Sequence, residues 1–261
     1  MRITVLGSGS STGTPSVEAG WGKCDPKNPK NRRTRPSILV EDQIEGVSKS
    51  VLVDTSPDLR EQLLRHEIKH LDGVVYTHAH ADHLHGIDDL RGINRLMNAP
   101  IEAFADAGTI ASIQRRFGYV LEPLSPEATM FYKTTLNMHA FHHGEAFNAG
   151  GLEVTAIEQD HAYMTTFGLR FGDFAYTTDL ISMHEDGFEL LKGIKVWMLG
   201  TFAATLHPTH LDVETALAWC ERVKPERAYF THLGFGLDFE TLQAKLPKNI
   251  FVAYDGLTIE V

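Results

Sequence analysis

The chain has 261 residues, and its 24 Lys+Arg against 34 Asp+Glu give a formal net charge of −10 with histidine neutral. With 43% hydrophobic and 22% charged residues, its composition is that of a globular protein and excludes general disorder. The acidic balance argues against tight binding to long nucleic acids, which requires many Lys and Arg contacts to phosphates.

The chain starts on an apolar strand pattern at Ile3 to Leu6, without the charged, apolar and cleavage regions of a secretion signal. No run of 18 or more apolar residues occurs anywhere. We therefore expect a cytoplasmic protein without a membrane partner. Neither a repeat nor a Gly/Ser-rich linker divides the sequence, which predicts one domain over residues 1–261.

Short apolar runs rich in β-branched residues recur along the chain and predict strands. They are Ile3 to Leu6, Ile38 to Val40, Val51 to Val53, Val74 to Tyr76, Leu152 to Ile157, Phe167 to Phe171, Val196 to Leu199, Ala228 to Phe230 and Ile250 to Val252. Patterns of helical period lie between some of them, at Pro57 to His66, Ala107 to Phe117 and Leu211 to Val223. The expected fold class is α/β or α+β, a mixed sheet arrangement flanked by helices.

The two cysteines, Cys24 and Cys220, are far apart in the sequence. They exclude a disulfide framework and a four-cysteine zinc site within one chain. Cys220 shares the apolar face of the last helical pattern with Val213, Ala216 and Leu217, so we expect it in the core.

The most informative segment directly follows the strand pattern Val74 to Tyr76 and places three imidazoles and a carboxylate within six residues. These candidate ligands are His78, His80, Asp82 and His83. Histidine and aspartate supply the nitrogen and oxygen atoms that zinc, manganese or iron prefers. Four ligands in one tight turn cannot all face one ion with good geometry, so the segment predicts two metal ions.

Three further candidate ligands each stand just past an apolar strand pattern. They are His161, Asp179 and His232. Ligands at strand ends are rigidly placed, while the loops that carry them leave room for a substrate. We expect all three to lie at the same edge of the sheet arrangement as the 78–83 segment.

The order His78-x-His80-x-Asp82-His83, followed by the three later ligands, resembles the full ligand set of the metallo-β-lactamase-fold hydrolases, over nearly the whole chain. The resemblance implies a four-layer αββα sandwich with a dinuclear site at the edge between the two sheets. By position, it implies that one metal takes His78, His80 and His161. The other would take Asp82, His83 and His232, with Asp179 as the bridge.

Within this superfamily, the Gly/Ser-rich segment Leu6 to Pro15 is similar to the first loop of ribonuclease Z. It is also similar to that of the cyclic-phosphate phosphodiesterase of the carbon-phosphorus lyase pathway, and both enzymes cleave phosphate esters. Lactam hydrolysis is not expected, because the lactamases use a cysteine ligand and lack the histidine that corresponds to His83. The segment Thr209 to Asp212 resembles one in which a histidine outside the metal shells contacts the reacting phosphate.

Thr209 and Asp212 are spaced as in a capping box, which predicts a helix start that places His210 in the first turn. Free N–H groups there favour an anion, and a histidine beside them can protonate a departing alkoxide. We therefore expect His210 and Asp82 to be catalytic; the alternative for His210 is a surface position at a helix start. Asp54, after the strand pattern Val51 to Val53, is expected to orient a ligand histidine.

The stretch Lys23 to Arg35 is the one basic island in this acidic chain. Such runs are usually solvated loops; the alternative is that Arg32 or Arg33 binds a substrate phosphate through its guanidinium. Relatives of the phosphodiesterase carry a structural zinc on cysteines after the first loop and on a later histidine. Here Cys24 stands alone and the later position is Phe235, so we expect no such zinc.

Ribonuclease Z carries a protruding arm that grips transfer RNA. Only ordinary strand and helix patterns are evident between His83 and His161. The absence of an arm pattern and the acidic composition argue against transfer-RNA processing.

The expected charge of the site favours an anionic substrate. Two divalent ions would contribute +4, Asp82 and Asp179 −2 and a bridging hydroxide −1, which leaves the site at +1. We expect a dinuclear-metal-dependent phosphodiesterase that hydrolyses a small nucleotide-like or cyclic phosphodiester by a metal-bridging hydroxide, with zinc or manganese, or alternatively iron. The alternatives are a thioester or lactone hydrolase of the same fold, a di-iron redox or sensing protein, and a non-catalytic metal-binding module. Related enzymes often form homodimers, which stays open here.

Overall fold

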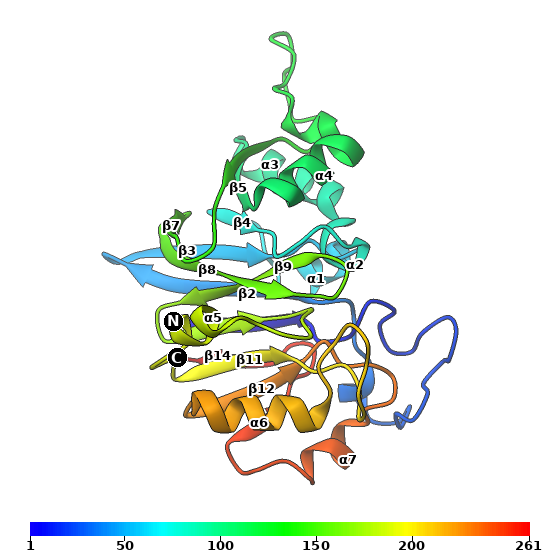
Figure 1. Ribbon diagram of the computed structural model, residues 1–261. Coiled ribbons are helices and arrows are strands. Elements are labelled where there is room, and N and C mark those ends of the chain that lie inside the picture. Colours follow the sequence, from blue (N-terminus) through cyan, green and yellow to red (C-terminus); the bar gives the residue numbers. More distant parts are fainter.

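The computed structural model describes residues 1–261 and contains two seven-stranded sheets (Figure 1). The first has the order β14 (Thr258–Glu260), β1 (Arg2–Gly7), β2 (Ser37–Ile44), β3 (Val47–Val53), β4 (Gly73–Val75), β5 (Ile101–Ala105) and β6 (Leu136–Ala140). The second has the order β13 (Ile250–Val252), β12 (Arg227–Thr231), β11 (Val196–Gly200), β10 (Phe174–Thr177), β9 (Thr165–Phe171), β8 (Leu152–Asp160) and β7 (Ala146–Ala149).

Each sheet is antiparallel in one half and parallel in the other. Strands β3 to β6 pair in parallel, as do β10 to β13, whereas the remaining pairs are antiparallel. Crossovers between parallel strands need connecting segments, and these carry most of the helices. The carboxyl ends of the parallel strands therefore place several connecting loops at one edge of each sheet.

Helices cover the outer faces of both sheets, above and below them in Figure 1. The first four are α1 (Leu59–Arg65), α2 (Ala81–Leu84), α3 (Arg91–Met97) and α4 (Ala107–Phe117). The others are α5 (Glu185–Leu190), α6 (Val213–Val223) and α7 (Phe239–Gln243), and three short 3-10 helices are η1 (Pro29–Asn31), η2 (Ile87–Leu90) and η3 (Gly118–Leu121). The α/β sandwich expected from the sequence is confirmed.

Three hydrophobic layers hold these elements together. The central layer lies between the sheets, where Val5 and Val53 of the first sheet share a cluster with Tyr176 and Met198 of the second. An outer layer packs α1, α3 and α4 on the first sheet, and another packs α5, α6 and α7 on the second. Cys220 belongs to the latter and is 6% exposed, as expected from its helical pattern.

The start of α6 differs from its prediction. Asp212 itself is the N-cap, because its carboxylate accepts a hydrogen bond from the backbone N–H of Thr215 at 2.9 Å. The predicted cap at Thr209 is therefore wrong, and His210 lies in the loop before the helix rather than in its first turn. The expectation that the free N–H groups at the start of α6 favour an anion beside His210 therefore loses its basis.

The segment between η3 and β6 also differs from expectation. Residues 122–135 contain neither helix nor strand, and part of this segment forms the loop that projects from the body at the top of Figure 1, whereas Phe131, Thr134 and Thr135 are buried. Their only cationic side chain is Lys133, which bonds to the backbone carbonyl oxygens of Tyr119 and Glu122. The projection therefore offers no cluster of cations for a phosphate backbone.

The first loop, between β1 and β2, is tied to the far end of the chain. Asp255 accepts hydrogen bonds from the backbone N–H and hydroxyl of Ser8 and of Thr34, at 2.7–2.9 Å. The backbone N–H of Ser10 donates to Leu233 O, and that of Leu233 donates to Ser8 O. The loop is thereby fixed beside the chain that follows β12.

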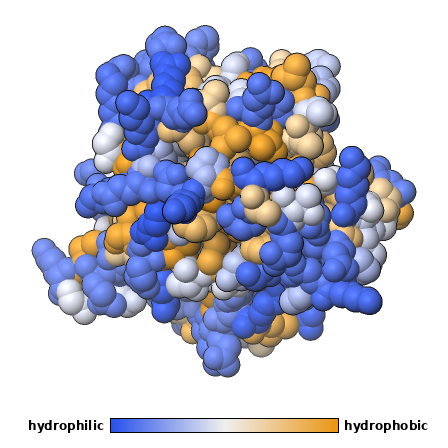
Figure 2. Space-filling model, turned by 90° about the horizontal axis from the view of Figure 1, so that it is seen from below, coloured by the Kyte–Doolittle hydropathy of each residue, from blue (hydrophilic) through white to orange (hydrophobic).

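The surface seen from below in Figure 2 is mostly hydrophilic, with hydrophobic residues gathered in patches between charged ones. Such patches are ordinary on a folded surface. None of the helices combines the length and apolar character needed to span a lipid bilayer.

Candidate metal centre

The 78–83 segment is placed by β4, a three-residue strand of the first sheet. β4 is buried between β3 and β5, and after Tyr76 the chain turns into α2. Asp82 and His83 occupy this helix, while His78 precedes it and His80 is its N-cap residue. A buried parallel strand that ends in a tight helical turn thus carries four candidate ligands at one sheet edge.

The second sheet supplies the other three candidates. His161 follows β8, Asp179 follows β10 by two residues, and His232 directly follows β12. Six of the seven residues are at most 5% exposed, and only His80 is open to solvent. The structure brings all seven together, and the site requires both sheets.

Asp179 lies at the centre of this group and faces two sets of histidines. Its Oδ1 atom is 2.9 Å from His232 Nε2 and 3.4 Å from His83 Nε2. Its Oδ2 atom is 3.5 Å from His78 Nε2 and 3.7 Å from His161 Nε2. One carboxylate that presents one oxygen to each set has the geometry of a bridging ligand.

The donor set fits divalent cations. The Nε2 atoms of His78 and His83 are buried and make no hydrogen bond, which is costly unless another partner occupies them. Ligand atoms gather within 4.8 Å of one another in three sets: Asp82, His83, Asp179 and His232; His78, His80 and Asp179; and His161, Asp179 and His210. These nitrogen and oxygen atoms suit zinc, manganese or iron.

The first of these sets matches one metal of the expected assignment. For the other metal, His161 is grouped with His210 rather than with His78 and His80, although its ring centroid lies 5.2 Å from that of His80. His210 is thus close enough to Asp179 to be considered as a ligand itself.

Asp54 orients two of the ligand rings. This buried carboxylate accepts hydrogen bonds from His83 Nδ1 at 2.6 Å and from the backbone N–H and hydroxyl of Thr77, both at 2.8 Å. The Thr77 hydroxyl oxygen is in turn 3.0 Å from His78 Nδ1. Because both Nδ1 atoms are engaged, both rings present Nε2 to the site. The role of Thr77 was missed from the sequence.

His161 is oriented differently, since its Nδ1 atom donates to the backbone carbonyl of Thr209 at 2.6 Å. A further contact was also missed: the Arg116 guanidinium on α4 donates to Ala79 O at 2.6 Å, between two ligands of the 78–83 segment. Each contact joins a ligand segment to a part of the chain that is distant in sequence.

Three site residues have left-handed backbone conformations: Asp54 (φ 63°), Asp179 (φ 49°) and His232 (φ 55°). Positive φ is uncommon outside glycine, although aspartate and histidine tolerate it better than most residues. Such conformations cost about 1–3 kcal/mol each and persist where surrounding structure enforces them. All three stand just past a strand end, where the abrupt turn directs the side chain toward the shared edge.

In the set of Asp82, His83, Asp179 and His232, attraction between opposite charges shifts the pKa values of the side chains. Burial opposes the charged form of this ring, but Asp179 and Asp82 outweigh burial and raise its pKa to about 9. Burial likewise opposes ionisation of Asp179, yet His232 and His83 hold the pKa of its carboxyl well below the usual range. By contrast, burial and the neighbouring His78 lower the pKa of His80 to about 4.

Metal binding by the metal-free protein is therefore expected to release protons. His232 is protonated at pH 7 because its pKa is raised above 6.5, and a cation must displace that proton. Affinity for Zn²⁺ or Mn²⁺ should rise by about tenfold per pH unit for each displaced proton, up to about pH 9. Calorimetric titration in buffers of different ionisation enthalpy measures this release; an affinity that is flat from pH 6.5 to 9 would contradict it.

Replacing Asp54 by asparagine should lower metal affinity by about 10- to 100-fold. The amide cannot satisfy His83 and Thr77 as the carboxylate does, and asparagine tolerates the left-handed backbone at this position. Competition with a chelator measures the affinity. The matched control is Asp173→Asn, which removes a carboxylate from an exposed ion pair with Lys195. Equal affinities in the two variants would contradict the orienting role.

His210 lies at the site although the predicted helix start is wrong. Its ring stacks on Phe202 and on His232, with centroid separations of 4.9 and 5.0 Å, and is 4.7 Å from the ring of His161. Burial and the neighbouring His232 lower the pKa of His210 to about 3. The ring is therefore neutral at pH 7 in the metal-free protein and carries one N–H.

The two arginines of the basic stretch have different environments. Arg33 is 2% exposed, and its guanidinium reaches Gly234 O at 3.4 Å, Asn31 Oδ1 at 3.3 Å and Cys24 Sγ at 3.9 Å. It fastens the first loop to the chain after His232. Arg32 is exposed and lies over the ring of Trp21, so only this arginine of the pair is open to a ligand.

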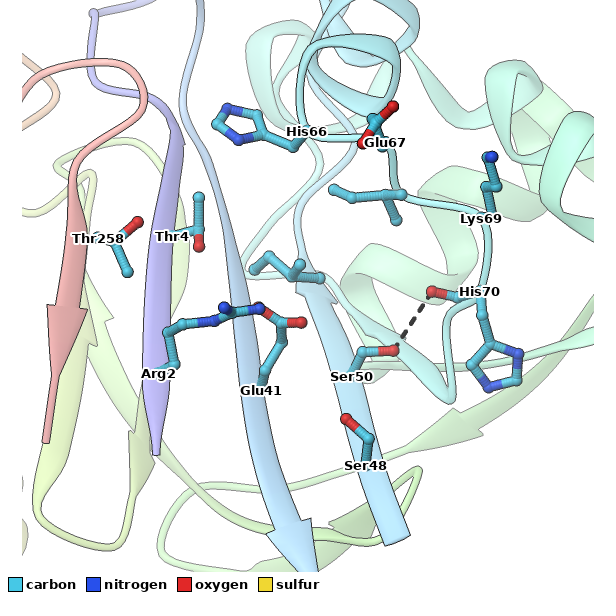
Figure 3. Close-up of a pocket in the computed structure, with 12 residues that line it drawn as sticks. Arg2, Thr4, Glu41, Ser48, Ser50, His66, Glu67, Lys69, His70 and Thr258 are labelled. Carbon is cyan, nitrogen blue, oxygen red and sulfur yellow. Dashed lines mark hydrogen bonds and ion pairs between the residues drawn. The ribbon is translucent and has the colours of Figure 1, made fainter.

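A cavity of about 400 Å³ opens onto the ligands. It is lined by Ser11, His80, Ala81, Asp82, His161, Tyr163, Met164, Asp179, Thr209 and His210. A larger cavity, of about 510 Å³, lies on the outer side of β1, β2 and β3 (Figure 3). There Arg2 and Glu41 neutralise each other at 2.8 Å, and none of the three candidate ligand sets contributes to it. The smaller cavity, which candidate metal ligands line, is therefore the candidate substrate site.

Comparison with known proteins agrees with this geometry. A family model described as "Beta-lactamase superfamily domain" matches residues 49–233, more than half of the chain. A curated protein of Porphyromonas gingivalis (strain ATCC BAA-308 / W83), named "Octanoyltransferase", is 31% identical over 260 residues. That match covers 98% of the chain and 51% of the relative, so the chain spans about half the length of this relative.

Solved structures share the fold over the full chain. A diphosphatase from the PhnP family is 35% identical, with a TM-score of 0.86, and the match covers 100% of this chain and 97% of that one. Zn²⁺-bound PqqB from Methylobacterium extorquens is 20% identical (TM-score 0.76; 100% of both chains), and the human short form of tRNase Z is 17% identical (TM-score 0.66; 100% and 99%). The chain therefore belongs to the β-lactamase superfamily.

Proposed function

We propose that the protein is a dinuclear-metal-dependent phosphodiesterase acting on a small nucleotide-like or cyclic phosphodiester. The observation that carries the proposal is the position of Asp179, with one oxygen facing His83 and His232 and the other facing His78 and His161. The 35% identity to a diphosphatase over nearly the full length of both chains supports a phosphate substrate. Because both sheets supply ligands, we propose that residues 1–261 act as one hydrolase domain.

Divalent ions at this site would supply a nucleophilic hydroxide at neutral pH and stabilise charge on the reacting phosphate oxygens. The candidate ligand sets contain two carboxylates, Asp82 and Asp179, against four positive charges from two such ions. A pocket that remains positive inside a chain of net charge −10 attracts an anionic phosphate. We propose zinc or manganese as the ion, with iron as the alternative, since the ligand types accept each of them.

His210 is proposed to hold the leaving oxygen. Its ring lines the cavity, is fixed between Phe202 and His232, and carries one N–H in its neutral form. A nearby phosphate charge favours the protonated ring, so the substrate itself would prepare His210 to give a proton to the departing alkoxide. We propose that Asp82 takes part in the same reaction as a metal ligand. Its Oδ2 atom lies 3.3 Å from His83 Nε2 and 3.4 Å from His232 Nε2.

Hydrolysis of bis-para-nitrophenyl phosphate by the metal-loaded protein tests the proposal. Nitrophenol release should require added Mn²⁺ or Zn²⁺ and stop on chelation. An acyl thioester under the same metal loading forms the second arm, because it represents the competing hydrolase chemistry. Thioester hydrolysis without phosphodiester hydrolysis, or no phosphodiester turnover with any divalent metal, would overturn the proposal.

A further inference from the structure

The cavity at the metal centre has two unlike walls. The buried candidate ligands Asp82, His161 and Asp179 line it on one side, here called the inner wall, and the exposed Tyr163 lines it on the other, here called the outer wall. Tyr163 is 90% exposed, and Val17 is the only large hydrophobic side chain that is more exposed. Its hydroxyl makes no hydrogen bond, and its ring stacks on no other aromatic ring. The cavity therefore combines buried candidate ligands with a solvent-exposed aromatic ring.

This exposed ring stands on a rigid turn. The backbone N–H of His161 donates to Met164 O at 3.0 Å, and that of Tyr163 donates to His161 O at 2.8 Å. Ala162 has a left-handed backbone (φ 64°), and its N–H donates to the Asp160 carboxylate at 2.8 Å. These bonds therefore fix the backbone of Tyr163, two residues from a metal-ligand candidate.

The chemistry of the two walls defines the class of substrate. The inner wall suits a phosphate, since it carries the candidate metal ligands and His210. The outer wall suits a flat apolar group, because aromatic rings stack on the faces of nucleobases. A nucleotide joins these two groups through one sugar, whereas a cyclic sugar phosphate has no flat group to offer.

We propose that Tyr163 is a specificity-determining residue that stacks on the base of a nucleotide substrate while its phosphate lies at the metal centre. This inference rests on the proposed function and narrows it to phosphodiesters that carry a nucleobase. Stacking acts on substrate binding rather than on the reacting bonds, so it changes KM more than kcat.

Calorimetric binding to the metal-loaded protein provides the test, with adenosine 5′-monophosphate and ribose 5-phosphate as probes. The two probes share a phosphate and a ribose, and only the first carries a base. The unmodified protein should bind the nucleotide about tenfold more tightly. Tyr163→Ala should remove that difference without changing the affinity for ribose 5-phosphate, and Tyr163→Phe should retain it. The matched control is Tyr132→Ala, another exposed tyrosine that lies outside this cavity.

Equal affinity of the unmodified protein for the two probes would overturn the inference, as would a Tyr163→Ala variant that binds both less tightly. Each variant is also assayed for metal-dependent hydrolysis of bis-para-nitrophenyl phosphate. If the unmodified protein hydrolyses this ester but does not distinguish the probes, the base subsite fails and the proposed function stands. If it hydrolyses no phosphodiester with any metal, the proposed function fails.

Discussion

Replacing His210 by alanine is expected to lower the turnover of a phosphodiester by about 10²- to 10⁴-fold while leaving the metal content unchanged. The imidazole lines the cavity and is fixed by the rings of Phe202 and His232, so its removal takes away a positioned proton donor. Steady-state kinetics and elemental analysis of the same preparation measure the two quantities. The loss of turnover in His210→Ala should be smaller for a substrate whose leaving group has a low pKa, because such a group departs without a proton.

The matched control is His139→Ala, which changes an exposed histidine that pairs with Glu102 and does not line the cavity. It should retain most of the turnover. His210 also belongs to a set of possible ligand atoms with His161 and Asp179. Loss of one metal ion in His210→Ala would therefore contradict the role of proton donor and make this side chain a ligand.

Replacing Asp179 by asparagine is expected to lower turnover by about 10³-fold or more and, unlike His210→Ala, to lower the occupancy of both metals. The amide keeps the size of the side chain and tolerates the left-handed backbone, but it lacks the charge and the second oxygen. Both histidine sets then lose the carboxylate that they share. Kinetics and metal analysis at equal metal supply measure the effect.

A comparison with Asp54→Asn distinguishes a bridging from an orienting role. Asp54 contacts His83 and Thr77 but belongs to none of the candidate ligand sets. Excess metal should therefore restore most of the turnover of the Asp54→Asn variant. Excess metal should not restore Asp179→Asn. Equal restoration of the two variants would show that Asp179 does not bridge.

The ligands were predictable because their signal is local. His78 to His83 stand within six residues of one another, and His161, Asp179 and His232 each follow a strand that apolar residues mark clearly. Such strands end at a common sheet edge, so the sequence pattern carries spatial information. The nine predicted strands all correspond to observed strands, and the predicted helix Ala107 to Phe117 coincides with α4.

The remaining features depend on contacts that sequence spacing does not encode. Thr209 and Asp212 both suit a cap, and only the folded loop determines that Asp212 binds Thr215 N–H. Arg33 appears in the sequence as part of a charged loop, yet it is buried against Gly234, which lies 201 residues later. Thr77 acts on His78 because Asp54, just past the end of β3, fixes its hydroxyl. The cases of Arg33 and Thr77 both involve a partner distant in the chain.

Seven side chains from both sheets are proposed to hold two divalent cations with Asp179 between them. Metal analysis of the purified protein after loading with Zn²⁺ or Mn²⁺, combined with anomalous diffraction from its crystals, tests this directly. We expect two ions per chain, one beside His83 and His232 and the other beside His78 and His161. A single ion per chain at saturating metal, or two ions located away from Asp179, would contradict it.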